Sequence, residues 1–405
     1  MKAPVLAWLS CIALTARLLP AGAAPAKAAQ ASPTCAMAGW AEVGITPPLG
    51  IALGGRGGPE TLADKVLDPL SAQVLYLKDP KGTGFVLVSL DLIGLPHELS
   101  DRIRTALAQE LGVPWDLVVL NTSHTHSGPY TLRPLMAGLG PAPQIEVDYF
   151  HTLQAKLIAA ARTAVQALHP VEVKVFHGTS RLGINRRGRD SAGHTVMIPN
   201  PQAPFDDKVW VMELSPKDGQ APAVVFSYAC HPVLVYGYAR AAISADYPGV
   251  TRRRLREALG DGAHVQFVQG FAGDIRPRIV ADLAGHRFRQ PRPEDVQAAG
   301  NDLAQAVLRA LKSPGQTLAL DLAGAADRPF LPRAQPPPRS RYEQMRATAL
   351  ATTNGFRLAV SQYWLKRYDS GQGFARGDAW PLGLIRLATN QWVVLSGGEP
   401  CIEWR

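Results

Sequence analysis

The feature that most constrains this chain is a short apolar run that leads into two histidines. Residues 117–120 are Leu-Val-Val-Leu, which has the length and β-branched composition of a buried strand. His124 and His126 follow shortly after, and Ser-Gly-Pro then takes the chain out of the sheet. Side chains at i and i+2 on a strand end lie on one face, so we expect the two imidazoles to point the same way. They could form a hydrogen-bonded core pair, but neutral imidazole is also the commonest metal ligand, which favours a functional site.

A second histidine follows another apolar strand. Residues 224–228 read as a strand, and Cys230, His231 and Pro232 come directly after it. Alone, His231 is open between a structural and a functional role. We do not expect Cys230 and His231 to work as a nucleophile and base, because neighbours on a strand point to opposite faces. Cys230 is therefore interpreted as a small buried residue.

Two acidic residues also sit on glycine turns after strands. Asp274 follows the predicted strand 265–269 and could simply cap its own turn. Glu399 follows the last strand and is either a metal ligand or a turn residue. Together His124, His231 and Glu399 would make the His₂Glu set of an open catalytic zinc site.

The remaining chain alternates strands and helices. Asp246 opens one of the helices, where it is either the N-cap or a hydrogen-bond acceptor that orients a histidine. Strands are predicted at 85–92, 117–123, 171–176, 208–214, 223–228, 265–269, 383–389 and 391–395, and helices at 96–111, 148–168, 248–259, 293–311 and 341–368. This pattern predicts a single large α/β domain over residues 40–405, with a mixed central β-sheet flanked by helices.

The N-terminus is predicted to be a targeting segment. Residues 1–28 carry a lysine, an apolar stretch at Val5–Leu14 and small residues that offer cleavage sites after Ala23 or Ala28. Residues 29–39 are expected to be a linker. The expected location is therefore secreted or periplasmic.

Composition narrows the function classes. The formal net charge is +9, yet the basic runs at 186–189 and 252–254 lack interleaved aromatic residues, so nucleic-acid binding is not expected. After removal of the N-terminal segment, Cys35, Cys230 and Cys401 remain, which is too few for a disulfide framework, although Cys35 and Cys401 could pair.

A glycine-rich segment at residues 50–58 lacks the strand-to-helix context of a phosphate-binding loop. It is therefore interpreted as a turn.

Taken in order, several short segments resemble the neutral ceramidase family from about residue 40 onward. The matching segments are Gly44–Gly50, Ser89–Asp91, His124–Pro129, Asn185–Arg186, Ala229–Pro232, Ala245–Asp246, Gly273–Pro277 and Gly398–Glu399. The resemblance implies a zinc amidase that splits ceramide, a lipid amide, into sphingosine and a fatty acid. Contact with a membrane surface is a further expectation for such a substrate.

The resemblance also implies roles for individual residues. His124, His231 and Glu399 would bind one zinc ion. His126 would transfer the proton, and Arg186 would contact the substrate carbonyl.

The chain departs from the family at two places. Arg276 stands where the family has serine, so it would shape the substrate pocket. The sequence ends at Arg405, whereas the family continues with a tyrosine ligand and an immunoglobulin-like domain, so that part is expected to be missing. Two alternatives follow: an inactive, truncated remnant that binds a lipid or envelope partner, and a hydrolase of another N-acyl amine.

Overall fold

A large mixed β-sheet organises the described part of the chain. The computed structural model describes residues 35–56, 60–131, 141–371 and 375–402. The strands of the large sheet run in the order β12-β10-β9-β6-β1-β3-β4-β5, with β16 paired to β6 outside that order. Their bounds are β1 (Met37–Gly44), β3 (Ser71–Lys78), β4 (Gly84–Leu90), β5 (Val118–Thr122), β6 (His169–Thr179), β9 (Lys208–Pro216), β10 (Ala223–Tyr228), β12 (His264–Gln269) and β16 (Gln316–Thr317). The pairs β4–β5 and β10–β12 are parallel and the other neighbours are antiparallel, so the predicted mixed sheet is confirmed.

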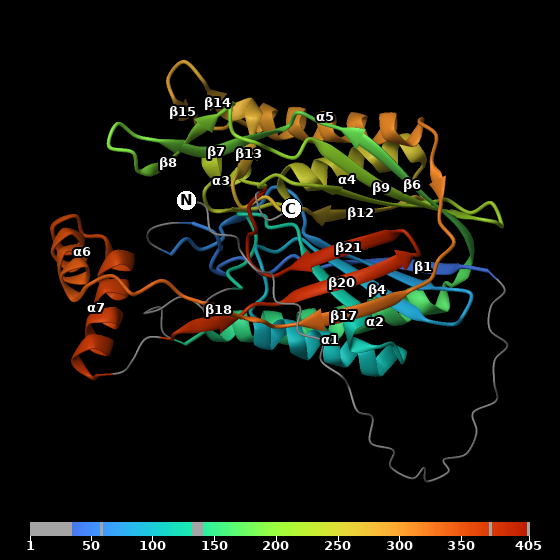
Figure 1. Cartoon of the computed structure of the whole chain (residues 1–405), viewed down its shortest axis with the longest axis horizontal. Coiled ribbons are helices and arrows are strands. Elements are labelled where there is room, and N and C mark those ends of the chain that lie inside the picture. Colours follow the sequence, from blue (N-terminus) through green and yellow to red (C-terminus); the bar gives the residue numbers. More distant parts are fainter. Residues whose placement is uncertain (1–34, 57–59, 132–140, 372–374, 403–405) are drawn as a thin grey trace, which may run out of the picture. The chain divides into compact units, whose positions relative to one another are not determined.

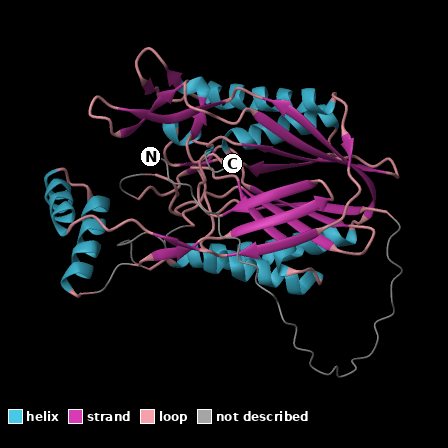
Figure 2. Ribbon diagram, viewed as in Figure 1, coloured by secondary structure: helices cyan, strands magenta, loops and turns pink. Residues whose placement is uncertain are grey.

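Helices cover the outer faces of this sheet, as predicted for the α/β class. They are α1 (His97–Leu111), α2 (Gln144–Gln166), α4 (Asp246–Leu259) and α5 (Pro293–Leu311). Figures 1 and 2 show α1 and α2 along one side of the strands and α4 and α5 along the other. Alternate residues of β3 serve different cores: Val74 packs in the cluster that includes α1 and α2, whereas Leu75 packs in a cluster between strands.

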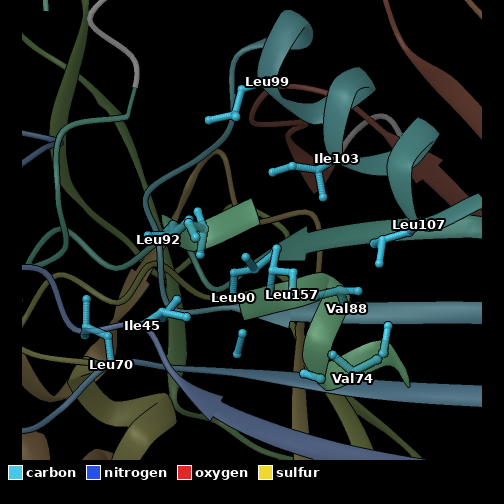
Figure 3. Packing of buried hydrophobic residues seen from close by; sticks show 14 of the residues in the cluster. Ile45, Leu70, Val74, Val88, Leu90, Leu92, Leu99, Ile103, Leu107 and Leu157 are labelled. Carbon is cyan, nitrogen blue, oxygen red and sulfur yellow. The ribbon is translucent and has the colours of Figure 1, made fainter. Parts of the chain in front are cut away.

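The α1 face illustrates how sequence spacing produces this packing. Leu99, Ile103 and Leu107 are buried at intervals of one helical turn and face the strands, where Val88 and Leu90 lie in the same cluster (Figure 3). The helix ends at Gly112, whose φ of 64° is left-handed, a common way to stop a helix.

The sheet folds over so that its two halves face each other, which the sequence pattern does not predict. Gln266 of β12 donates to the Ser89 hydroxyl of β4 at 3.1 Å. Asn121 of β5 exchanges hydrogen bonds with the backbone of Gln269, the last residue of β12. The carboxyl ends of β5 and β12 are therefore held together, and the residues that follow them can meet.

Shorter elements surround this core. They include the sheets β13-β7-β8, β17-β20-β21, β11-β2, β14-β15 and β18-β19. The strands are β2 (Lys65–Val66), β7 (Gly183–Arg189), β8 (Thr195–Asn200), β11 (Ala242–Ile243), β13 (Ile275–Pro277), β14 (Ala281–Asp282), β15 (Arg287–Phe288), β17 (Ala323–Asp327), β18 (Phe330–Pro332), β19 (Gly377–Ala379), β20 (Leu382–Ala388) and β21 (Gln391–Ser396), and the helices are α3 (Val235–Tyr238), α6 (Arg339–Ala351) and α7 (Gly355–Asp369). The predicted final hairpin is confirmed as β20–β21.

Three details of the predicted organisation need comment. Strand β1 begins at Met37, so the last part of the expected linker 29–39 is wrong: those residues pair with β3. The helix expected over 341–368 is two helices, α6 and α7, and Thr353 between them has a left-handed φ of 50°. The expected signal segment 1–28 lies outside the described residues.

No disulfide joins Cys35 to Cys401, both of which are described. Cys230 is fully buried, and burial raises the pKa of its thiol, so its expected role as a small core residue is confirmed. Across the described ranges, no helix combines the length and the apolar character needed to cross a bilayer.

Candidate metal centre

The two histidines after β5 lie in a turn rather than on the strand. The strand ends at Thr122, and His124 has a left-handed φ of 64°. The amide of His124 donates to the Leu92 carbonyl at 2.9 Å, and that of His126 to the Pro232 carbonyl at 3.2 Å. The expected strand geometry was therefore wrong, but the turn still brings the two imidazoles together, with ring centroids 5.1 Å apart.

His231 joins them from the turn after β10. Its ring centroid lies 4.9 Å from that of His124 and 5.7 Å from that of His126. Its side chain is 1% exposed, and burial lowers its pKa to about 4. Burial, assisted by the neighbouring imidazoles, also holds the pKa of His126 well below its usual value. Both rings are therefore neutral at neutral pH.

Main-chain carbonyls fix the orientation of all three rings. A carbonyl oxygen can only accept, so each ring donates from Nδ1 and directs its Nε2 away from that carbonyl. The bonds run from His124 to Ile93 at 2.6 Å, from His126 to Gly55 at 2.7 Å, and from His231 to Ala272 at 2.6 Å.

The three imidazoles could hold a metal ion. One ligand atom from each of His124, His126 and His231 can be chosen so that all three lie within 4.8 Å of one another. Among the described residues, the Nε2 atoms of His124 and His126 are buried without a hydrogen-bond partner. Leaving a buried polar atom unpaired costs about 1–3 kcal/mol, which a metal bond would remove.

Glu399 approaches the same nitrogens from the turn after β21. Its Oε1 lies 3.4 Å from Nε2 of His124, and its Oε2 lies 3.1 Å from Nε2 of His231. These two histidines hold the pKa of the Glu399 carboxyl well below its usual range. Zinc–ligand bonds of 2.0–2.1 Å at tetrahedral angles separate ligands by about 3.3 Å, so both spacings suit a shared ion.

Glycines allow Glu399 to come this close. Gly398 has a left-handed φ of 68°, and a Cβ on Gly273 would lie only 2.2 Å from the Glu399 carbonyl oxygen. The Gly273 amide also donates to the Pro400 carbonyl at 2.9 Å. The turn before Asp274 and the turn at Glu399 therefore pack directly on each other.

Arg186 of β7 lies beside Glu399 at the histidine cluster. One Nη donates to the Gly273 carbonyl at 2.7 Å and lies 3.8 Å from the Glu399 carboxylate. Burial lowers the pKa of Arg186, and the charge of Glu399 opposes that shift. The guanidinium is therefore held at the edge of the histidine cluster.

Asp274 is buried and ties three segments of this wall together. Its carboxylate accepts from the Asn185 side chain at 2.9 Å and from the Ile402 amide at 3.1 Å. Its carbonyl accepts from the Arg186 amide at 2.7 Å. The alternative that Asp274 only caps its own turn is wrong, because each of these partners lies on another segment.

Asp246 does not contact a histidine, so its expected role as a histidine-orienting acceptor is wrong. It is the first residue of α4, and the residue before it, Ala245, occupies the N-cap position. Its carboxylate accepts from the amides of Leu234 and Val235, each at 2.8 Å. Asp246 therefore holds the backbone that follows His231, and complete burial raises its pKa to about 6.

Arg276 sits on β13 beside this wall. One of its Nη atoms lies 3.3 Å from the Met197 sulfur, and its guanidinium carbon stacks 4.8 Å above the Phe288 ring. These contacts hold it on the β7–β8 side, and none of them is with a histidine of the cluster.

Sequence reasoning missed the other wall of the site, which comes from the glycine-rich segment. Gly55 has a φ of 73°, and its carbonyl holds His126. Arg56 donates from Nε to the His126 carbonyl at 3.1 Å, and the Tyr236 ring lies 5.6 Å from the His126 ring. The signal was the run of glycines, which marks backbone that must approach a neighbour closely.

The site therefore has the donor set of a metal-binding centre at the carboxyl ends of strands in an α/β fold. No family model matches the chain. Among solved structures it is similar to neutral ceramidase from Pseudomonas aeruginosa, with a TM-score of 0.65 and 15% identity over 88% of this chain and 61% of that one. It is also similar to a ceramidase complexed with C2, with a TM-score of 0.59 and 17% identity over 76% of this chain and 48% of that one.

These similarities establish a ceramidase-like α/β fold. The expected resemblance to the neutral ceramidase family is confirmed at the level of structure. The chain spans about three fifths and one half of the length of the two matched proteins.

Proposed function

We propose that this protein is a zinc-dependent amidohydrolase that cleaves the N-acyl amide bond of ceramide or a related lipid. The observation that carries the proposal is the convergence of three imidazoles and one carboxylate, with two buried Nε2 atoms that lack a hydrogen-bond partner among the described residues. The similarity to neutral ceramidases supports the choice of an amide substrate.

His124, His231 and Glu399 would hold the ion, since the carboxylate lies against these two nitrogens at spacings that suit zinc. When bound, zinc would supply Lewis-acid polarisation of the amide carbonyl and would lower the pKa of a water to about 7. Such a site keeps a position open for substrate.

His126 would take up the proton at Nε2 and return it to the leaving amine. Its neutral state and its Nδ1 bond to Gly55 leave that nitrogen ready to accept. Arg186 would donate to the substrate carbonyl oxygen as negative charge develops on it. Asp274 would keep Arg186 and the Glu399 turn in place.

The test is metal content and ceramide hydrolysis in the purified protein. His124→Ala and His231→Ala should lose both zinc and activity, whereas His126→Ala should keep zinc and lose activity by roughly 10²–10⁴-fold. His151→Ala, at an exposed position of α2, is the matched control and should change neither. Activity that survives a chelator and both ligand substitutions would contradict the proposal.

Loss of zinc in His126→Ala would instead make His126 a ligand and overturn only the assignment of roles. A folded wild-type protein that binds lipid, but that neither binds zinc nor hydrolyses amides, would support the alternative of an inactive lipid-binding protein.

We further propose export of the protein, on the basis of the N-terminal sequence. Fractionation of cells and N-terminal sequencing of the mature protein test it. A mature chain that retains its first 28 residues in the cytoplasm would contradict it.

A further inference from the structure

Arg56 presents an unused donor at the edge of the candidate metal centre. Its Nε donates to the His126 carbonyl at 3.1 Å, and one terminal nitrogen lies 3.5 Å from the Ser127 hydroxyl. The other terminal nitrogen is buried and has no hydrogen-bond partner among the described residues. A guanidinium has five N–H donors, so this arrangement leaves part of its fork available for a bound group.

The positive charge of Arg56 has no carboxylate partner among the described residues. Burial, and then the positive charge of Arg240, lower its pKa to about 10, and the nearby Tyr236 only partly opposes this. Within the described ranges, no carboxylate lies at ion-pair distance from Arg56. By contrast, Arg186 on the other side of the cluster faces Glu399.

A largely buried guanidinium with an unpartnered donor and no carboxylate beside it is a favourable place for an anion. Carboxylate and phosphate groups accept paired hydrogen bonds from the arginine fork, and burial strengthens that interaction. Because Arg56 also holds the backbone of His126, an anion bound there would lie next to the amide being cleaved.

We propose that Arg56 forms an anion subsite, and that the preferred substrate is a lipid amide with an anionic group close to the cleaved bond. This inference rests on the proposed amidohydrolase function. Neutral ceramide has no such group, whereas an N-acyl amino acid or an N-acyl phosphoethanolamine does. The subsite would therefore distinguish this protein from an enzyme that acts on neutral lipid amides alone.

The experiment compares three substrates with the same acyl chain: N-dodecanoylglycine, N-dodecanoyl-phosphoethanolamine and N-dodecanoylethanolamine. The zinc-loaded full chain, Arg56→Gln and Arg56→Lys are assayed for KM and kcat. Arg162→Gln is the matched control, since Arg162 is exposed on α2 and pairs with Glu110. A preference between the two anionic substrates tells whether the subsite suits carboxylate or phosphate.

The wild-type protein should prefer at least one anionic substrate. Arg56→Gln should raise KM for that substrate by roughly 10- to 100-fold more than for the neutral amide, which reports any shared effect of the lost contact with the His126 backbone. Arg56→Lys should recover part of the loss, and Arg162→Gln should behave as wild type. Equal use of all three substrates by the wild type, or an equal loss on all three in Arg56→Gln, would overturn the subsite.

The two proposals can fail separately. If the wild type cleaves no amide, the proposed function fails, and calorimetric binding of dodecanoylglycine against dodecanoylethanolamine still tests the subsite. The subsite is supported if the wild type binds dodecanoylglycine more tightly than dodecanoylethanolamine and Arg56→Gln abolishes that difference. It is overturned if the wild type binds the two compounds equally.

Discussion

Replacement of Gly55 by alanine tests whether the glycine-rich segment sets the position of His126. The φ of Gly55 is 73°, and a Cβ there would lie 2.5 Å from Nδ1 of His126 and 2.2 Å from the Ile93 side chain. Real Cβ contacts almost never fall below 3.0 Å, so the imidazole would have to move. It cannot move without weakening its 2.7 Å bond to the Gly55 carbonyl.

The expected cost has two parts. The left-handed backbone costs an alanine about 1–2 kcal/mol of folding stability. The contact with His126 requires a displacement of roughly 0.5 Å or more, and misplacing a catalytic group by ~1 Å can cost about 10²-fold in rate. Gly55→Ala should therefore lower kcat/KM for amide hydrolysis by roughly 10- to 100-fold.

Gly50→Ala separates the two parts. Gly50 lies in the same segment, has a φ of 84°, and has no atom within 4 Å of the added Cβ. It should lose a similar amount of stability in urea denaturation but keep its activity. Histidine ¹⁵N NMR spectra provide a readout independent of turnover, with the His126 resonances shifted only in Gly55→Ala. Identical activity and spectra in the two variants would refute the steric argument.

Three further predictions concern buried polar groups. Asp91→Asn leaves Arg252 without the carboxylate that it contacts at 2.6 and 2.9 Å, and urea denaturation should show a loss of about 3–5 kcal/mol, whereas a loss below about 1 kcal/mol would contradict it. Burial lowers the pKa of His264 to about 4 in the folded protein. As the pH falls, the unfolded chain therefore protonates this histidine before the folded protein does. The free energy of unfolding should fall by about 3 kcal/mol between pH 6.5 and pH 4. His264→Asn should flatten that part of the pH–stability curve, and an unchanged slope would disprove the assignment. Asp274→Asn places an amide donor against another donor and should cost about 1–3 kcal/mol, with a loss of activity that the similarly destabilised Gly50→Ala variant does not show.

Local signals in the sequence were sufficient for much of the fold. The helix 293–311 has both bounds as predicted, because Pro293 opens it, and the Asp295 carboxylate accepts from the Arg292 amide at 2.8 Å. The hairpin that turns at Asn390 is equally local. The break at Thr353 was missed although Asn354 and Gly355 signal a turn: Asn354 is the N-cap of α7 and accepts from the Arg357 amide, and Thr353 has a left-handed φ of 50°.

The candidate site was predictable where residue type carries the chemistry. His124, His231 and Glu399 do converge, although His124 reaches the site through a left-handed turn and not along a strand. The contribution of Arg56 was not predictable, because its contact with His126 spans 70 residues and depends on how the strand ends meet.

The way the histidines are held has a chemical consequence for the proposed function. Each Nδ1–H is bound by a main-chain carbonyl, from Ile93, Gly55 or Ala272, and not by a carboxylate. A neutral partner fixes the ring without adding negative charge, so Glu399 alone among the three proposed ligands would offset the charge of a bound cation. Arg186 lies beside that carboxylate and Arg56 beside His126, so two guanidinium groups flank the site, where they would favour the build-up of negative charge on a carbonyl oxygen and the binding of an anionic substrate.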